Sequence, residues 1–249
     1  MKASGLQMKK PLRHRSQRPL NKNYIKHSHK KSKKSVGEHS FGNIQVIIKD
    51  YFTNDIDLDM VLDDVAAKIP HEFLELIDYI IIGQFKELEN RSVNAAYMDG
   101  AIYATNDQTN EEDLIDDIIH EVAHAVEEKH FMEIYSDKYI EREFLGKRER
   151  LYHLLEQEKI EMNYQDFLEP EYSADFDNFL YFEVGYPLLS AVSVNLFYSP
   201  YAITSLREYF ANGFEAYFNN KDRNRVHVLS PILFDKLEKL DYNNGKKRR

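Results

Sequence analysis

The sequence predicts an α+β fold with a small β-sheet near the N-terminus, one central helix packed on that sheet, and a mostly α-helical C-terminal lobe. Three observations favour this class. Short strand-like apolar runs lie between residues 43 and 106, a capped amphipathic helix follows them, and long segments beyond residue 130 have helical spacing. A chain of 249 residues is long enough to enclose a site within one large core.

The predicted sheet comes from three apolar segments. Residues 43–52 contain the run IQVII, and residues 76–85 are rich in β-branched and apolar side chains. Residues 95–106 predict two short strands that flank a turn at Asp99 and Gly100. These segments together predict a small sheet before the first long helix.

Two helices in this half are predicted from apolar spacing and from capping signals. Residues 58–69 have an amphipathic pattern that Pro70 closes. Thr109 and Glu112 have the spacing of a capping box, so we expect a longer helix to begin there and to run to about Lys129. Its apolar residues form a broad stripe, which predicts packing against the preceding strands.

Charge divides the chain into two unequal regions. The formal net charge is −9 at pH 7, yet residues 1–37 contain nine Lys and three Arg and no Asp or Glu. Setting this arm and the basic residues 246–249 aside leaves 17 basic residues against 42 acidic ones, a net charge of about −25. The arm is poor in large apolar side chains, so we expect it to be disordered when alone.

We predict one folded domain over residues 38–245. It divides into an N-lobe at 38–130, a helical insertion at about 131–178 and a C-lobe at 179–245, followed by a basic tail at 246–249. No apolar run approaches the roughly 18 to 20 residues that a membrane helix needs, and the arm has no signal-peptide pattern. The sequence therefore favours a cytoplasmic protein without membrane contact.

One string inside the long predicted helix carries chemistry: His120, Glu121, Val122, Ala123 and His124 form an H-E-x-x-H motif. The two histidines lie about 40° apart and one turn displaced on a helix, so both imidazoles reach a single metal ion. Glu121 lies on the adjacent face, where it reaches a water at the metal and serves as a general base. Cysteine is absent, so His and carboxylates must hold the metal, which we predict to be Zn²⁺.

The site needs a third protein ligand, and Glu208 is the better candidate. It lies beside the aromatic stripe of a helix predicted at residues 205–219, where a buried carboxylate is costly without a cation. The alternative for Glu208 is a surface residue paired with Arg207 or a nearby Lys. His130 is an alternative ligand by its spacing, but Glu127 occupies the position where that extended motif requires Gly.

Asn212 lies one turn after Glu208 on the same predicted helix face. From this place we predict that it orients His120 through a hydrogen bond outside the ligand set.

These motifs resemble the lethal-factor-type zinc metallopeptidases, a family that includes the anthrax lethal factor catalytic domain and the Pro-Pro endopeptidases. The matching features are H-E-V-A-H-A-V, a Tyr seven residues before the candidate ligand Glu, and E-Y-F-A-x-x-F, within residues 95–219. The resemblance implies a zincin-like fold and peptide hydrolysis. It also implies the following roles: zinc ligands His120, His124 and Glu208, base and then acid Glu121, and oxyanion donor Tyr201.

The predicted function is therefore a zinc endopeptidase acting on a protein or peptide substrate, which pairs with the strand edge within residues 95–105. One alternative is a nucleic-acid-associated or assembly protein whose basic arm contacts a polyanion by charge attraction. The arm also fits a pro-segment that blocks the cleft, a localisation signal or a solubilising tail. The segment between His124 and Tyr201 is longer than the compact family members need, and we interpret the charged helix at residues 135–161 as an insertion. It fits a lid, a substrate-binding wall or a docking surface.

Overall fold

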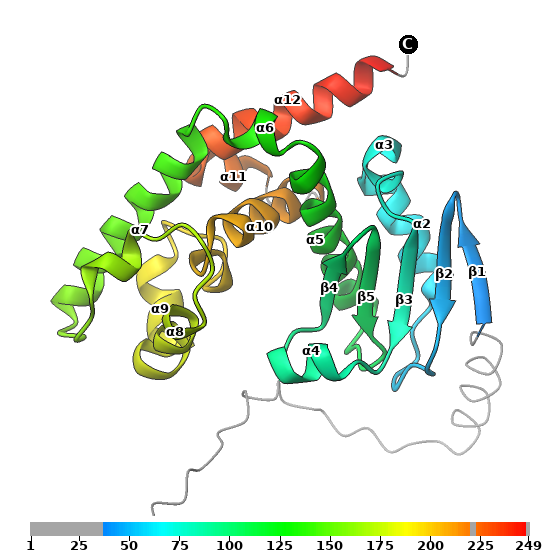
Figure 1. Cartoon of the computed structure of the whole chain (residues 1–249), viewed down its shortest axis with the longest axis horizontal. Helices are drawn as coiled ribbons and strands as arrows, with labels where there is room; N and C mark the ends of the chain where they lie inside the picture. Colours follow the sequence, from blue (N-terminus) through cyan, green and yellow to red (C-terminus); the bar gives the residue numbers. More distant parts are fainter. Residues whose placement is uncertain (1–36, 220–222, 248–249) are drawn as a thin grey trace, which may run out of the picture.

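The computed structural model of the chain describes residues 37–219 and 223–247. These residues form an α+β fold with a five-stranded sheet at one end and a mostly helical part at the other (Figure 1). The predicted arm lies outside the described residues except for Gly37. The strands are β1 (Gly37–Phe41), β2 (Ile44–Ile48), β3 (Tyr79–Gly83), β4 (Ala95–Met98) and β5 (Ala101–Thr105).

The sheet has the order β1-β2-β3-β5-β4, with parallel pairing among β2, β3 and β5 and antiparallel pairing at both edges. Its interior is apolar, because Val46, Ile80 and Ile102 face one another across neighbouring strands and are almost completely buried. The predicted turn between β4 and β5 is confirmed, with positive φ at Asp99 and Gly100 as a two-residue hairpin requires. β4 is thus an edge strand, and it faces the helical part of the molecule (Figure 1).

The first strand was not predicted. β1 has the polar sequence GEHSF, which lacks the apolar alternation that identifies a strand, and it begins at a residue that we assigned to the arm. Its pairing with β2 follows from the tight turn at Gly42, whose φ is +59°.

The long helix α5 (Glu111–Lys129) ends where the sequence predicted but begins with a different cap. Asn110, rather than Thr109, is the N-cap, and its Oδ1 accepts a hydrogen bond from the Asp113 backbone N–H at 2.9 Å. Asn is the stronger N-cap residue of the two, and acidic side chains fill the first turn in either case. The apolar stripe of α5 is fully buried and packs on β4, β5 and α2 (Leu58–Lys68).

Of the remaining helices, the first ones along the chain lie beside the sheet and the later ones extend away from it (Figure 1). They are α3 (His71–Leu74), α4 (Lys86–Arg91), α6 (Phe131–Tyr135), α7 (Tyr139–Gln157), the 3-10 helix η1 (Tyr164–Phe167), α8 (Ala174–Asn178), the π-helix η2 (Phe179–Val184), α9 (Tyr186–Ser193), the 3-10 helix η3 (Tyr201–Ile203), α10 (Leu206–Phe218), α11 (Arg223–Leu229) and α12 (Pro231–Lys247). α10 confirms the helix predicted at residues 205–219. Ser173 is the N-cap of the short helix α8, and its side chain accepts a hydrogen bond from the Phe176 backbone N–H.

α10 connects the two halves of the molecule. It packs against α5 more extensively than any other helix does, and it also contacts α12 (Figure 1). Gly213 permits the second contact, since a Cβ at this position would lie 2.2 Å from Leu233 Cδ2. One hydrophobic core runs from Ile44 in β2 to Leu240 in α12. α12 itself extends to Lys247, so the predicted basic tail begins inside a helix.

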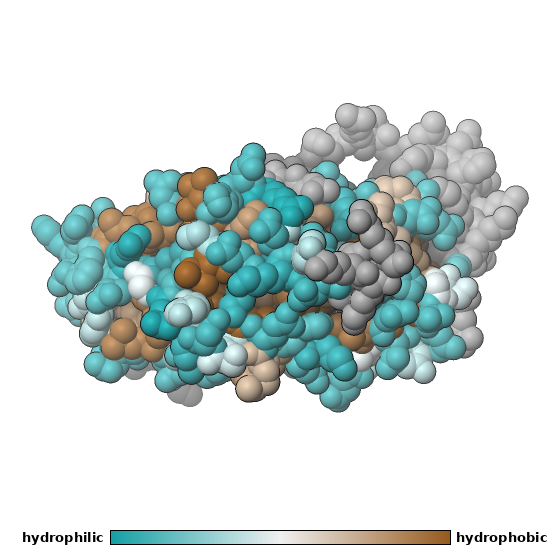
Figure 2. Space-filling view, turned by 90° about the horizontal axis from the view of Figure 1, so that it is seen from above, coloured by the Kyte–Doolittle hydropathy of each residue, from teal (hydrophilic) through white to brown (hydrophobic). Residues whose placement is uncertain are grey.

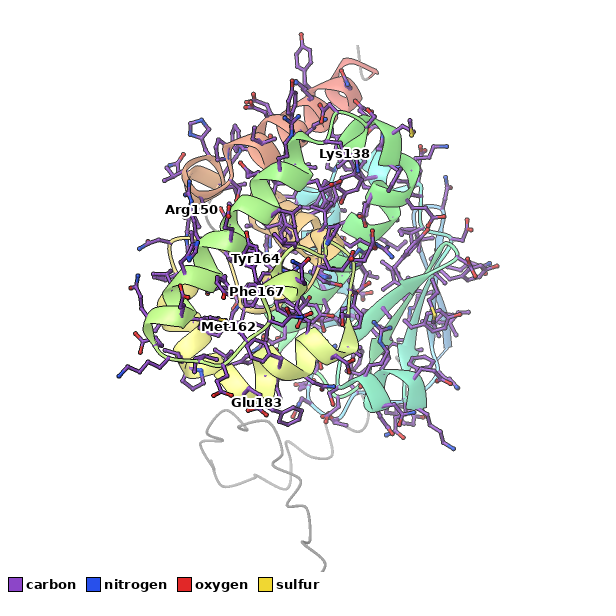
Figure 3. The ribbon with its side chains drawn as sticks, turned by 60° about the vertical axis from the view of Figure 1, so that its left-hand side comes forward. Lys138, Arg150, Met162, Tyr164, Phe167 and Glu183 are labelled. Carbon is purple, nitrogen blue, oxygen red and sulfur yellow. The ribbon has the colours of Figure 1, made fainter. Side chains whose placement is uncertain are left out.

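Within the segment predicted as an insertion, α7 and η1 pack around a group of aromatic side chains that is continuous with this core. The ring of Phe167 lies 5.3 Å from that of Tyr152 and 5.1 Å from that of Phe176. Figure 3 shows Tyr164 and Phe167 beside α7. Buried Arg148 donates to the carbonyl oxygens of Asp166 and Glu169, which joins η1 and the loop after it to α7.

The face shown in Figure 2 is mostly hydrophilic, with apolar patches between the hydrophilic residues. Across the described residues, every helix is too short or too polar to cross a lipid bilayer.

Candidate metal centre

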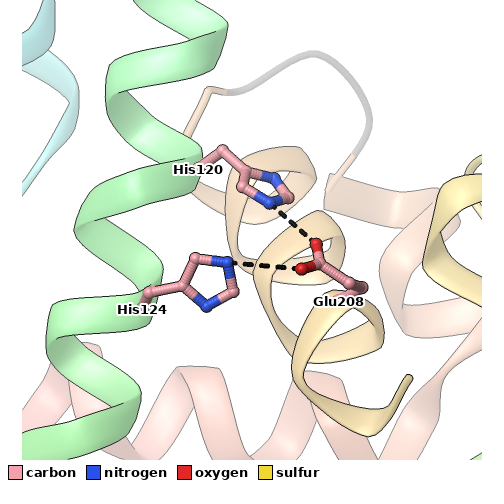
Figure 4. Close-up of side chains that lie close together, drawn as sticks. All are labelled: His120, His124 and Glu208. Atoms are coloured by element: carbon pink, nitrogen blue, oxygen red, sulfur yellow. Dashed lines mark hydrogen bonds and ion pairs between the residues drawn. The ribbon is translucent and has the colours of Figure 1, made fainter. Parts of the chain in front are cut away.

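Two imidazoles from α5 and one carboxylate from α10 converge between these helices (Figure 4). His120 Nε2 lies 3.0 Å from Glu208 Oε2, and His124 Nε2 lies 3.7 Å from Glu208 Oε1. Within residues 37–219 and 223–247, this is the one group of three such side chains whose ligand atoms all lie within 4.8 Å of one another. The predicted trio can therefore hold a metal ion.

Local helix geometry explains this convergence. His120 and His124 are one turn apart on α5, and their ring centroids are separated by 5.1 Å. Glu208 lies in the first turn of α10, where its backbone N–H donates to the N-cap hydroxyl of Ser205 at 3.2 Å. The positive end of a helix dipole favours a carboxylate at this position.

The electrostatics of the trio favour an additional positive charge. Burial alone would lower the pKa of His120, but its contacts with Glu208 and Glu215 raise that pKa well above the ordinary value. Burial likewise favours the neutral form of Glu208, yet the two neighbouring histidines lower the pKa of its carboxyl group. The cluster therefore favours a positive charge, which a bound proton supplies in the absence of metal and which a metal cation could supply in its place. Two His and one carboxylate are donors typical of zinc.

Each histidine also faces a second carboxylate through its other ring nitrogen. His120 Nδ1 lies 3.5 Å from Glu215 Oε2, and His124 Nδ1 lies 3.4 Å from Glu127 Oε2. In a histidine whose Nε2 binds a metal, the ring proton lies on Nδ1, and these carboxylates are placed to accept it there while Nε2 is directed towards Glu208. Both Nε2 atoms are thereby prepared to act as ligands.

The hydrogen bond predicted from Asn212 to His120 is not among those that Asn212 makes in the described part of the chain. Asn212 Nδ2 donates to the Glu208 carbonyl at 2.9 Å, and its Oδ1 accepts from Ser199 Oγ at 2.7 Å. Asn212 is one turn beyond Glu208, which brings it to the backbone of α10 instead of across to α5. Glu215, two turns beyond Glu208, reaches His120 instead.

His130, the alternative third ligand, lies outside the cluster. It is the C-cap residue of α5, and its Nδ1 lies 3.1 Å from Glu133 Oε2 on α6. α5 continues through Glu127 without the break that a Gly at this position would permit, so His130 lies almost two turns beyond His124.

Glu121 lies beside the ligands and contacts the edge of the sheet. It is buried, and its Oε2 accepts a hydrogen bond from the Tyr97 backbone N–H on β4 at 2.6 Å. In the register of β4, Tyr97 lies opposite Ile102 at a pair whose backbone groups point away from β5. The carboxylate is therefore held where the edge strand meets the histidines.

A cavity of about 1320 Å³ opens over these residues. β4 and the segment before it line one side, and aromatic residues that include Tyr172, Phe182 and Tyr186 line the other. Tyr201, in η3, also lines this cavity, and burial together with the charge of Glu208 raises its pKa. Its phenol therefore remains protonated and available as a donor near the metal-binding trio.

Asp117 is a further carboxylate in the cavity wall that the sequence did not single out. It lies one turn before Glu121 on α5, and Gln108 Nε2 donates to its Oδ2 at 3.0 Å. Burial raises the pKa of this carboxyl group to about 7, although the hydrogen bond from Gln108 opposes the shift.

Comparison of the chain with known protein families, with curated proteins and with solved structures finds no match in any of the three.

Proposed function

We propose that this chain is a zinc-dependent endopeptidase with a zincin-like fold, in which two histidines and one glutamate hold the metal. The observation that carries the proposal is the convergence of His120, His124 and Glu208 beneath a large cavity, with Glu121 beside them. An H-E-x-x-H helix supplies both the two ligands and the base of such enzymes. The motifs that resemble the lethal-factor-type peptidases agree with this ligand set and add Tyr201.

Each catalytic side chain has a separate task. A zinc ion at the trio would lower the pKa of a water molecule and polarise the scissile carbonyl. Glu121 accepts the proton of the attacking water and then delivers it to the leaving amine. Tyr201 donates its phenolic hydrogen to the oxygen of the tetrahedral intermediate, a role that its raised pKa supports.

The edge strand supports a peptide as substrate. β4 has no strand beyond it among the described residues, and Ala95 and Tyr97, which line the cavity, direct their backbone groups away from β5. The Tyr97 N–H already donates to Glu121, which leaves the Tyr97 carbonyl and the backbone groups of Ala95 for a substrate. An extended peptide can pair with such an edge through main-chain hydrogen bonds. Pairing here would bring the scissile bond beside Glu121. The edge is limited to Ala95–Met98, because β5 lies inside the sheet.

The test is zinc content by elemental mass spectrometry on protein purified without added metal. We expect one zinc per chain in the wild type and in Glu158→Ala, which removes an exposed carboxylate at the end of α7. We expect Glu208→Ala to lose zinc, because two histidines leave the site one ligand short. Zinc retained by Glu208→Ala would refute the ligand set, and a zinc-loaded wild type that cleaves no member of a peptide library would refute the activity.

The alternative of a nucleic-acid-associated or assembly protein depends on residues 1–37, nearly all of which lie outside the described residues. Polyanion contact through this arm therefore stays a prediction.

A further inference from the structure

Glu127 is a buried carboxylate that joins three helices behind the metal-binding trio. It is only 3% exposed and belongs to α5. Its Oε1 accepts from the phenol of Tyr135 on α6 at 2.7 Å, and its Oε2 accepts from Arg207 Nε on α10 at 3.0 Å. The same Oε2 lies 3.4 Å from His124 Nδ1.

A buried charge with this many partners is held in one place. Arg207 supplies a positive charge 3.0 Å from Oε2, and the Tyr135 phenol donates to Oε1. Several charge-assisted hydrogen bonds offset the cost of burying a carboxylate, and they also restrict the rotation of its side chain. Glu127 therefore presents a fixed negative oxygen to His124.

The two histidines differ in the support that they receive. Glu215, which faces His120, is 28% exposed and lies 3.5 Å away. Glu127 is almost completely buried and is held from both sides, by α6 and by the residue that precedes Glu208. The contact of His124 with Glu127 is therefore more rigid than the contact of His120 with Glu215.

We propose that Glu127 is a positioning residue of the metal centre, and that Tyr135 and Arg207 act through it to set the affinity of the site for zinc. The proposal rests on the zinc site of the proposed function but not on its hydrolytic activity. Tyr135 ends α6, the first helix of the segment predicted as an insertion. The packing of that segment is thereby coupled to metal retention.

The coupling has a direct physical cause. His124 binds metal through Nε2 only if its proton is on Nδ1 and its ring is turned towards Glu208. An anionic acceptor at Nδ1 imposes both conditions and increases the basicity of Nε2. Loss of the Tyr135 hydroxyl removes one of the bonds that hold Glu127, so the acceptor moves and the ring gains freedom.

The experiment measures the dissociation constant for zinc on the full chain, by competition with a chromophoric chelator. We expect Glu127→Gln to weaken binding by about 10- to 100-fold, the usual effect of losing a partner of a metal-bound histidine. Tyr135→Phe, which removes one hydroxyl, should weaken binding by about 10-fold on the same basis. The matched control is Tyr217→Phe, because Tyr217 is also a buried tyrosine, lies on α10 and donates to the carboxylate of Asp241.

A spectroscopic measurement separates positioning from general loss of stability. Cobalt in place of zinc gives visible absorption bands that depend on ligand geometry, so Tyr135→Phe should change the spectrum while Tyr217→Phe leaves it unchanged. In the double variant, Tyr135→Phe should add little to the loss caused by Glu127→Gln, because Tyr135 acts through Glu127.

Three outcomes would overturn the inference: wild-type zinc affinity in both Glu127→Gln and Tyr135→Phe, an equal loss in Tyr217→Phe, or fully additive losses in the double variant. The expected affinities together with a wild type that cleaves no peptide would support the inference and reject the proposed activity. A wild type that binds no zinc would reject both.

Discussion

Two buried polar clusters lie on either side of α10, and neighbouring residues supply them. Glu208 belongs to the metal-binding trio, whereas Tyr209 belongs to a cluster between α7 and α12. In this second cluster, Lys147 Nζ donates to Tyr209 Oη at 2.7 Å and to Ser230 Oγ at 2.6 Å. Tyr209 in turn donates to Glu143 Oε1 at 2.7 Å, and Glu143 also accepts from the first backbone N–H groups of α12.

The clusters differ in charge balance. In the second cluster, one lysine is matched by one glutamate that also caps α12, so its charges are neutralised from within. Around the trio, the carboxylates of Glu121, Glu208 and Glu215 surround two histidines and face a cavity. Burial of polar groups therefore does not identify a functional site by itself. The proposed metal site is distinguished from the second cluster by a shortage of positive charge beside a cavity.

The largest effect that would sharpen this comparison is expected from Glu121→Gln. Glutamine still accepts the hydrogen bond from the Tyr97 N–H but cannot take up a proton, so turnover should fall about 1000-fold, within the usual contribution of a general base. Zinc content and thermal stability should stay at wild-type values. Peptide-cleavage kinetics and elemental analysis measure both, with Glu158→Gln as a surface control. Normal turnover by Glu121→Gln would remove Glu121 from the mechanism.

Tyr201→Phe should have the second-largest effect. The change removes one hydroxyl from the cavity wall, and loss of an oxyanion donor lowers kcat by about 10- to 1000-fold. KM and zinc content should change little, because the phenol acts after the substrate has bound. Steady-state kinetics measures the change in kcat. The control is Tyr164→Phe, which alters a tyrosine that contacts Glu149 on the segment shown in Figure 3. Equal kcat values in the two variants would assign Tyr201 to packing.

A change in the second cluster should lower the stability of the fold and leave metal binding unchanged. Lys147→Met removes two hydrogen bonds and a cation over the Tyr209 ring, and it leaves Glu143 without its balancing charge. We expect a loss of about 2 kcal/mol in the free energy of unfolding, because hydrogen bonds to charged groups contribute roughly this amount. Zinc content should not change. Urea unfolding measures the loss, with Lys68→Met at a partly exposed ion pair as control.

If Lys147→Met instead lost zinc at unchanged stability, the distinction between the two clusters would fail. A comparable loss of stability in Lys68→Met would show that removal of any lysine has this effect.

The sequence predicted most of the first cluster because its signals are local. The spacing within one helix predicted His120, Glu121 and His124. The end of that helix was predicted correctly, whereas its N-cap is Asn110 and not Thr109. The prediction of Glu208 needed two further arguments: the energetic cost of a buried carboxylate and a resemblance to known motifs. The structure now places it opposite both histidines.

The outer carboxylates were missed because their contacts depend on how α10 crosses α5 (Figure 1). Glu215 lies two turns beyond Glu208, so its spacing was visible, but the distance to His120 was not. Glu127 was considered only as a residue in the place of a glycine. β1 was missed for a related reason, since a polar strand is recognisable only once its partner is known.

Asp117 provides the smallest predicted effect and a test of charge balance in the cavity wall. Its pKa is about 7 in the folded chain against 3.8 ordinarily, so the folded state binds more protons than the unfolded state between these values. Stability must therefore fall as pH rises through this window, by about 1 to 2 kcal/mol between pH 5 and pH 8 for a half-buried group.

Asp117→Asn removes this titration, so its stability relative to wild type should improve by the same amount from pH 5 to pH 8. Urea unfolding at the two pH values, in chelator so that no metal shifts the balance, measures the difference. Asp63→Asn, at an exposed carboxylate of α2, should show no such trend. If Asp117→Asn and wild type differ in stability by the same amount at both pH values, the cavity wall carries no excess of negative charge at Asp117. The charge imbalance would then be restricted to the trio and the carboxylates that contact it.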